Sequence, residues 1–136
     1  MERIEEITSK NKKLESNLLK LFKNYAESQT EPKFPIRVYE SRSKEIDAVW
    51  KRGDLTFIIE AKIIEAKSTQ FYEAIGQVFV YEYLYQKVYP NEKTKKGIVC
   101  EEHIIDQEFL SFCSEKDITI FVRTKNGFYE HEPKNY

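Results

Sequence analysis

Two acidic residues and a lysine are spaced in a way that could support chemistry. Asp47 lies within a short apolar stretch, and Glu60 and Lys62 close a second apolar run that begins at Leu55. Residues two apart in a strand point to the same face, so Glu60 and Lys62 would project together, and Asp47 could meet them from the neighbouring strand. Two converging carboxylates favour Mg²⁺ or Mn²⁺, and a lysine beside them could orient or help deprotonate the attacking water. The pattern predicts metal-assisted hydrolysis of a phosphodiester.

The helices and strands that must position these residues can be predicted from the spacing of apolar residues and from helix-breaking prolines. Apolar residues recur at helical spacing from Ile4 to Tyr25, and this helix ends near Ser28, before Pro32 and Pro35. Strands are predicted at 36–39, 45–50, 55–59, 97–100 and 118–122, and further helices at about 69–88 and 106–114. The order predicts an α/β fold with a mixed sheet and helices on both faces. The helix at 69–88 is apolar almost all round, so we expect it to be covered on more than one side.

Length and composition indicate a single domain, residues 1–136, with a core at about 4–122 and a peripheral tail at 123–136. The 22 basic and 23 acidic residues give a net charge of −1, which excludes a basic tail protein and an acidic disordered segment. Two cysteines form neither a disulfide framework nor a CxxC zinc pair. No apolar run approaches the ~20 residues that span a bilayer. We therefore expect no membrane segment and a cytoplasmic location.

The motif formed by Asp47 and Glu60-Ala61-Lys62 resembles that of the PD-(D/E)XK nuclease superfamily, with Ile46 in place of the proline. The element order resembles the αβββαβ core of its restriction-endonuclease-like fold over about 4–122, plus an additional helix and strand. More loosely, the stretch 34–62 is similar to the nuclease domain of type I restriction subunits.

A second motif supports the same resemblance. Gln77 and Tyr81 match the QxxxY pattern of RecB-like members, and at about 100° per residue they fall within roughly 40° of one another on a helix. They would therefore face one site together. Glu15 lies in the first helix, where many members carry an additional metal-site acid.

The resemblance implies a Mg²⁺- or Mn²⁺-dependent nuclease that cleaves DNA and leaves a 5′-phosphate and a 3′-hydroxyl. Asp47 and Glu60 would hold the metal, together with Glu15, while Lys62 would act on the attacking water. Gln77 would orient the site or touch the substrate backbone. Small members of the superfamily are often homodimers. Two alternatives stay open: a non-catalytic relative that binds nucleic acid or a protein, and a nuclease that acts on RNA.

The near-zero net charge means that nucleic-acid binding would need a local basic surface. The candidate contacts are Arg42, Lys44, Lys51, Arg52 and Tyr81. The alternative for the basic residues is an ordinary solvated face.

Each candidate site residue also has a structural alternative. Glu60 and Lys62 could be a solvated strand end, and Asp47 could cap a turn or pair with Arg42 or Arg52. Gln77 could be an ordinary helix amide, Tyr81 plain core, and Glu15 a boundary residue paired with Lys12. Residues 63–67 repeat the five residues 58–62, Ile-Ile-Glu-Ala-Lys, and this local duplication offers Glu65 and Lys67 as the acting pair. They lie past the apolar run, so we prefer Glu60 and Lys62.

Overall fold

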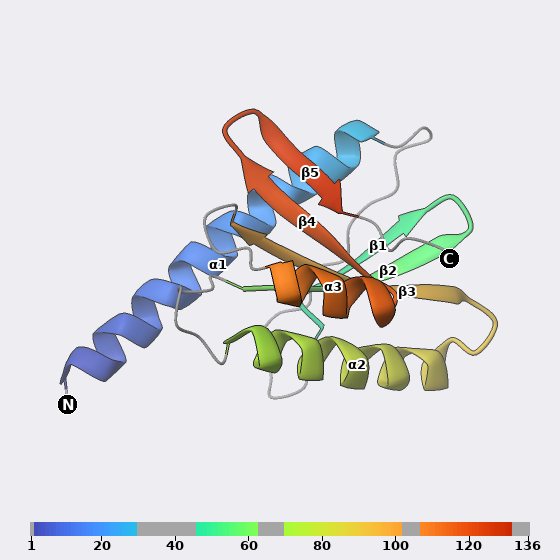
Figure 1. Ribbon diagram of the computed structural model, residues 1–136, viewed down its shortest axis with the longest axis horizontal. Coiled ribbons are helices and arrows are strands. Elements are labelled where there is room, and N and C mark those ends of the chain that lie inside the picture. Colours follow the sequence, from blue (N-terminus) through green and yellow to red (C-terminus); the bar gives the residue numbers. More distant parts are fainter. Residues whose placement is uncertain (1, 30–45, 63–69, 102–106, 132–136) are drawn as a thin grey trace.

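The computed structural model describes residues 2–29, 46–62, 70–101 and 107–131 (Figure 1). They form an α/β protein in which a five-stranded mixed sheet is flanked by three helices. In chain order the elements are α1 (Glu2–Gln29), β1 (Ala48–Arg52), β2 (Leu55–Ala61), α2 (Gln70–Val88), β3 (Lys93–Glu101), α3 (Gln107–Glu115), β4 (Ile118–Thr124) and β5 (Gly127–His131).

The strands lie side by side in sequence order, from β1 to β5. β1 and β2 form an antiparallel hairpin whose turn contains Gly53 at φ +64°, a left-handed backbone conformation that glycine adopts without steric penalty. β2, β3 and β4 are parallel, and β5 returns antiparallel to β4. The carboxyl ends of the three parallel strands therefore share one edge of the sheet.

The helices occupy opposite faces of the sheet, with α1 above and α2 and α3 below in Figure 1. Under α1 the core is aromatic: the Phe22 ring lies 4.9 Å from the Phe121 ring and 5.6 Å from the Trp50 ring between centroids. Under α2 and α3 the core is mainly aliphatic and includes Val78 and Ile120. The prediction of a mixed sheet with helices on both faces is confirmed.

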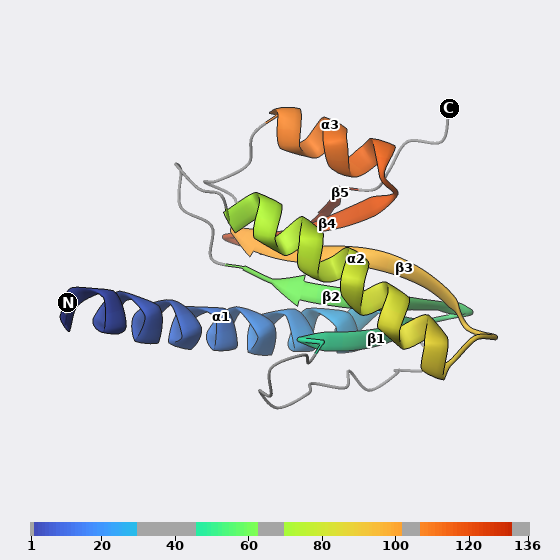
Figure 2. The same cartoon turned by 90° about the horizontal axis from the view of Figure 1, so that it is seen from below.

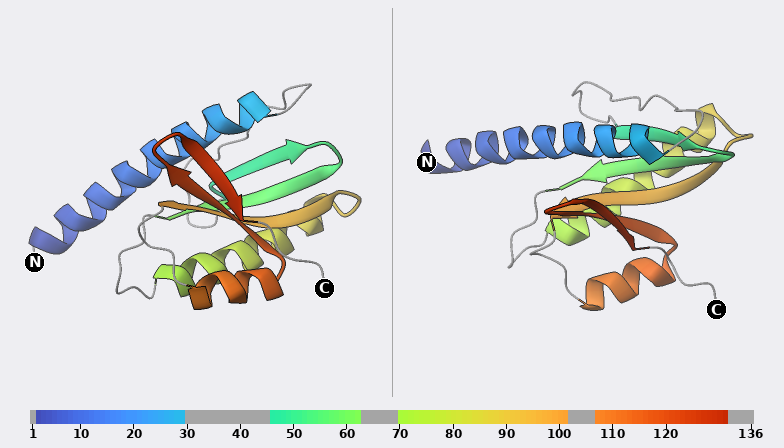
Figure 3. Two further views of the ribbon diagram at one scale, coloured as in Figure 1. Left: turned by 45° about the horizontal axis from the view of Figure 1, so that its top comes forward. Right: turned by 90° about the horizontal axis from the view of Figure 1, so that it is seen from above.

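The sheet curls around α1, which lies across it in the view from above (Figure 3). Arg52 of β1 and Glu130 of β5 belong to opposite edges of the sheet, yet Arg52 Nη1 donates to Glu130 Oε1 at 2.7 Å. The hydroxyl of Tyr25 on α1 donates to the other oxygen of Glu130 at 2.6 Å. Arg52 also lies over the Trp50 ring, 4.7 Å from its centroid. These contacts tie the two edge strands to the helix.

Two expectations need correction, and a third cannot be compared. Gly127–His131 lies in the stretch expected to be a peripheral tail, but it forms β5, and its Phe128 packs against the aromatic core. The helix α2 is not covered on more than one side by described residues, because Val80 and Tyr83 stay 54% and 56% exposed. The strand predicted at 36–39 lies outside the described residues.

Candidate active site

The hairpin register brings Asp47 and Glu60 together. Ala48 pairs with Ile59, so Asp47, directly before β1, stands opposite Glu60. Asp47 Oδ2 accepts a hydrogen bond from the Ala61 main-chain N–H at 3.0 Å, and the Asp47 and Glu60 side chains are hydrogen-bonded to each other. The predicted convergence of the two acids is confirmed, and Glu60 is buried, so it is not the solvated strand-end residue of the alternative interpretation.

Burial makes both carboxyl groups of this pair weaker acids than usual. The Glu60 side chain is 5% exposed, and burial followed by the Asp47 charge raises the pKa of Glu60 to about 9. Burial also raises the pKa of Asp47, against the opposing effect of the Ala61 N–H. Near neutral pH the metal-free pair therefore retains a proton on Glu60, which donates to the Asp47 carboxylate.

Lys62 supplies the nearest described cation. Its Nζ lies 4.0 Å from Glu60 Oε1 and 4.0 Å from Glu73 Oε2, and its side chain is 15% exposed. The Lys62 main-chain N–H donates to the Val99 carbonyl at 3.0 Å, which extends the β2–β3 pairing and fixes the base of the side chain. Glu73 could not be assigned to the site from the sequence, since its position in the first turn of α2 is the only signal it carries.

The inner side of α2 contributes the two residues of the second motif. Gln77 Oε1 is buried and has no hydrogen-bond partner among the described residues, and the same is true of Glu60 Oε2. Burial, and then the charges of Glu60 and Asp47, raise the pKa of Tyr81, so Tyr81 also lies near the pair. A buried acceptor without a donor is unfavourable unless something absent from the bare chain satisfies it.

Glu15 approaches the pair from α1. Its negative charge contributes to the raised pKa of Glu60, although burial and Asp47 contribute more. In the part of the chain that the structure describes, no three His, Cys, Asp or Glu side chains gather closely enough to enclose a metal ion. A role for Glu15 as a third metal ligand therefore stays a prediction. The alternative in which Glu15 pairs with Lys12 lies outside what the structure describes, because the Lys12 side chain is not among the described ones.

The donor set suits a cation that keeps part of its hydration shell. Mg²⁺ is commonly held by one or two carboxylates, with water and substrate phosphate completing its octahedron. Asp47 and Glu60 supply two carboxylates, and the unpartnered Glu60 Oε2 is a free acceptor. A divalent cation would replace the proton that the metal-free pair retains. The residues present fit Mg²⁺ or Mn²⁺.

The structure does not bring the predicted nucleic-acid contacts of the hairpin to this site. Lys51 Nζ pairs with Glu92 Oε1 at 3.0 Å, and Arg52 is bound to Glu130. Lys51 lies four residues and Arg52 five residues from Asp47 along the chain, which corresponds to about 13–17 Å in a strand. Both charges are paired within the fold, and a nucleic-acid contact by Lys51 or Arg52 stays a prediction. Arg42, Lys44 and the alternative pair Glu65 and Lys67 lie outside the described residues.

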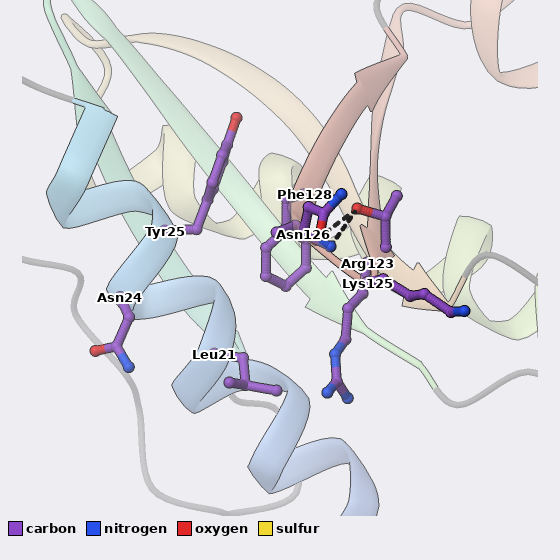
Figure 4. Close-up of a pocket in the computed structure, with 9 residues that line it drawn as sticks. Leu21, Asn24, Tyr25, Arg123, Lys125, Asn126 and Phe128 are labelled. Atoms are coloured by element: carbon purple, nitrogen blue, oxygen red, sulfur yellow. Dashed lines mark hydrogen bonds between the residues drawn. The ribbon is translucent and has the colours of Figure 1, made fainter.

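Two other features lie apart from the carboxylates. A pocket of about 520 Å³ opens between α1 and the β4–β5 turn, where Figure 4 shows Leu21 and Tyr25 on the helix side and Arg123 and Phe128 on the hairpin side.

Burial raises the pKa of each of the two thiols, Cys100 and Cys113, to about 12, so neither is a ready nucleophile. Within the described residues no helix is long and apolar enough to cross a membrane.

Comparison of the chain with protein-family models, with curated proteins and with solved structures finds no match. The fold stands as an α/β arrangement with a five-stranded mixed sheet and three helices. The residues around Asp47 and Glu60 are therefore the basis for a proposed function.

Proposed function

We propose that the protein is a divalent-metal-dependent nuclease that hydrolyses DNA phosphodiester bonds on a restriction-endonuclease-like fold. The observation that carries this proposal is the buried, hydrogen-bonded pair of Asp47 and Glu60 at the carboxyl end of β2, with the Lys62 ammonium 4.0 Å from Glu60. The helix α2 carries Gln77, whose buried Oε1 has no described partner, one turn from Glu73 beside Lys62 and one turn from Tyr81 near the pair.

A purely structural role accounts poorly for this arrangement. Two acids that share a buried position repel when both are ionised, and removing charges from water is expensive unless they are well paired. The nearest described cation stands 4.0 Å away, too far for a hydrogen bond, and Glu60 Oε2 has no partner among the described residues. Such a destabilising cluster is typical of a site that is completed by a ligand.

Each residue then has a role in the proposed reaction. Asp47 and Glu60 hold the cation, which when bound neutralises charge on the phosphodiester and makes water more acidic. Lys62 donates hydrogen bonds to the attacking water or to the phosphate oxygens, and Glu73 lies close enough to restrain its ammonium. Gln77 Oε1 accepts a hydrogen bond from the substrate or from the attacking water, and Glu15 adds negative charge that favours cation binding.

DNA is preferred as the substrate because of the resemblance, which also implies products with a 5′-phosphate and a 3′-hydroxyl. The experiment is to incubate the protein with Mg²⁺ or Mn²⁺ and labelled single-stranded, duplex and branched DNA, with RNA in parallel. We expect metal-dependent cleavage of at least one DNA substrate. Cleavage of RNA alone, or binding without cleavage under every metal condition, would support one of the two alternatives instead.

Variants connect any cleavage to the site. Asp47→Ala, Glu60→Ala and Lys62→Ala should each lower the rate at least ~100-fold, while circular dichroism shows an intact fold. Glu65→Ala and Lys67→Ala are the matched controls from the duplicated segment, and they should be mild. An inactive Glu65→Ala beside an active Glu60→Ala would contradict the assignment of Glu60.

A further inference from the structure

The outer side of α2 is an apolar surface that no described element covers. Figure 2 looks onto this helix from below, and no described helix or strand lies in front of it. Tyr72, Val80, Tyr83 and Val88 are exposed by 76%, 54%, 56% and 68%. Large apolar side chains exposed on one side of a helix are typical of an interaction site.

The residues on this side follow a heptad-like spacing of three and four. Glu73, Gly76, Val80, Tyr83 and Lys87 recur along one stripe, and at 100° per residue all five fall within about 60° of Val80. Glu73 and Lys87 are exposed and lie seven residues to either side of Val80, and the Glu73 side chain, which also lies 4.0 Å from Lys62 Nζ, is 60% exposed and can reach a partner. The stripe is therefore acidic at one end, apolar in the middle and basic at the other end.

That order makes the stripe complementary to a second copy of itself. When two α2 helices pack antiparallel about a two-fold axis at Val80, Glu73 of each copy faces Lys87 of the other. The same register sets Leu84, which is 38% exposed, against Gly76. A two-fold interface requires this self-complementarity, in which residue i contacts j and j contacts i.

Gly76 is an independent indication of close helix packing. It lies in the interior of α2, where glycine is less favourable than alanine. A Cβ built at Gly76 would meet nothing within 4 Å, and its φ is not in the left-handed range, so the described fold does not require glycine there. A glycine on a contact stripe lets a large side chain of the opposite helix come close to the backbone.

From these observations we infer that the chain forms a two-fold homodimer through antiparallel packing of α2 against α2. The exposed apolar side chains of this face amount to roughly 500 Å² per copy, which is somewhat less than the ~800 Å² per partner of a standard stable interface. The dimer is therefore a dissociable one. The two Glu73 residues would lie about 21 Å apart along the helix pair. The inference does not depend on the proposed nuclease activity.

Sedimentation equilibrium over an about 100-fold range of protein concentration tests this dimer. For the parent protein we expect the mass to rise from 16.3 kDa toward twice that value. Val80→Glu places two like charges at the two-fold axis and should weaken association at least ~10-fold with unchanged circular dichroism. Tyr129→Glu is the matched control, because Tyr129 is 60% exposed on β5 and outside the stripe.

Charge exchange tests the antiparallel register itself. Glu73→Lys and Lys87→Glu should each weaken association alone, since each opposes like charges twice in its own dimer. An equimolar mixture of the two variants, and the double variant, should both restore it, because opposite charges then face each other again. A mixture no more associated than either variant would overturn the register.

Other outcomes would overturn the dimer. A parent protein that stays monomeric throughout, or a Val80→Glu variant that associates like the parent, contradicts it. If Val80→Glu instead weakens DNA binding by a monomeric protein, the stripe is a nucleic-acid surface and not a dimer interface.

Discussion

The buried carboxylate pair should make the stability of the metal-free protein fall as pH rises. In the folded protein Glu60 keeps its proton up to about pH 9, whereas a glutamate in the unfolded chain has a pKa of 4.5. Between these values the folded state binds one more proton than the unfolded state, so the free energy of unfolding decreases with increasing pH. One full proton corresponds to about 1.4 kcal/mol per pH unit.

Glu60→Gln is the perturbation that isolates this effect. A glutamine resembles a protonated glutamate in shape, can still donate to Asp47 and cannot ionise. From pH 6 to pH 8 in EDTA, the parent should lose about 1–2.5 kcal/mol more than the variant, or roughly 5 °C in midpoint temperature for a chain of this size. Titrating groups that do not interact with Glu60 are common to both proteins and cancel in the comparison.

The assay is thermal and urea unfolding of both proteins across this pH range, without metal. At pH 8 the variant should be the more stable protein, and toward pH 5 the two should converge. Parallel stability curves would show that Glu60 ionises normally in the folded state. A variant that is less stable throughout would show that the pair is a structural contact.

Two further predictions concern the fold. Gly97→Ala should lower the free energy of unfolding by about 1–3 kcal/mol in urea denaturation. The reason is that a Cβ at this position would come within 2.6 Å of Ile59 Cδ1 and 2.9 Å of Phe121 Cε2. An unchanged midpoint would mean that this core is looser than described. Burial acts to raise the pKa of Glu92, but hydrogen bonds, first of all the one from Lys51, outweigh burial and lower this pKa. The Glu92 carboxylate therefore contributes stability above its unfolded pKa, and this stability is lost as pH falls through the folded pKa. Glu92→Gln should therefore destabilise the protein near pH 7 and match the parent in acid, and an equal deficit at both pH values would contradict this.

The pairing of Asp47 with Glu60 could be predicted from the sequence because it depends on local rules. Alternation along a strand fixes which residues share a face, and a tight turn at Gly53 and Asp54 fixes the hairpin register. The register then sets Asp47 opposite Glu60. The helices were predictable for the same reason, since apolar periodicity and proline breakers act over a few residues.

Contacts between distant segments could not be predicted in this way. From the sequence, Arg52 is expected to be a basic residue of an exposed turn. In the structure it is bound by Glu130, 78 residues along the chain, because the sheet curls until its edges meet. β5 is stabilised by β4 and by Phe128 in the aromatic core, and its own residues carry little apolar alternation. Glu73 reaches Lys62 only because α2 crosses beside the end of β2.

Binding of Mn²⁺ to the metal-free protein tests the central claim most directly. Thermal melts of the parent and of Asp47→Asn are compared in EDTA and in Mn²⁺. The asparagine keeps the shape and can still accept from the Ala61 N–H, but it removes one charge. In EDTA the variant should match the parent or exceed it by up to about 1 kcal/mol. Mn²⁺ should raise the midpoint of the parent, since a ligand that binds only the folded state stabilises it, and should leave the variant unchanged. A parent whose midpoint does not move with Mn²⁺, or a variant that responds as fully as the parent, would contradict the assignment of Asp47 and Glu60 as a metal site.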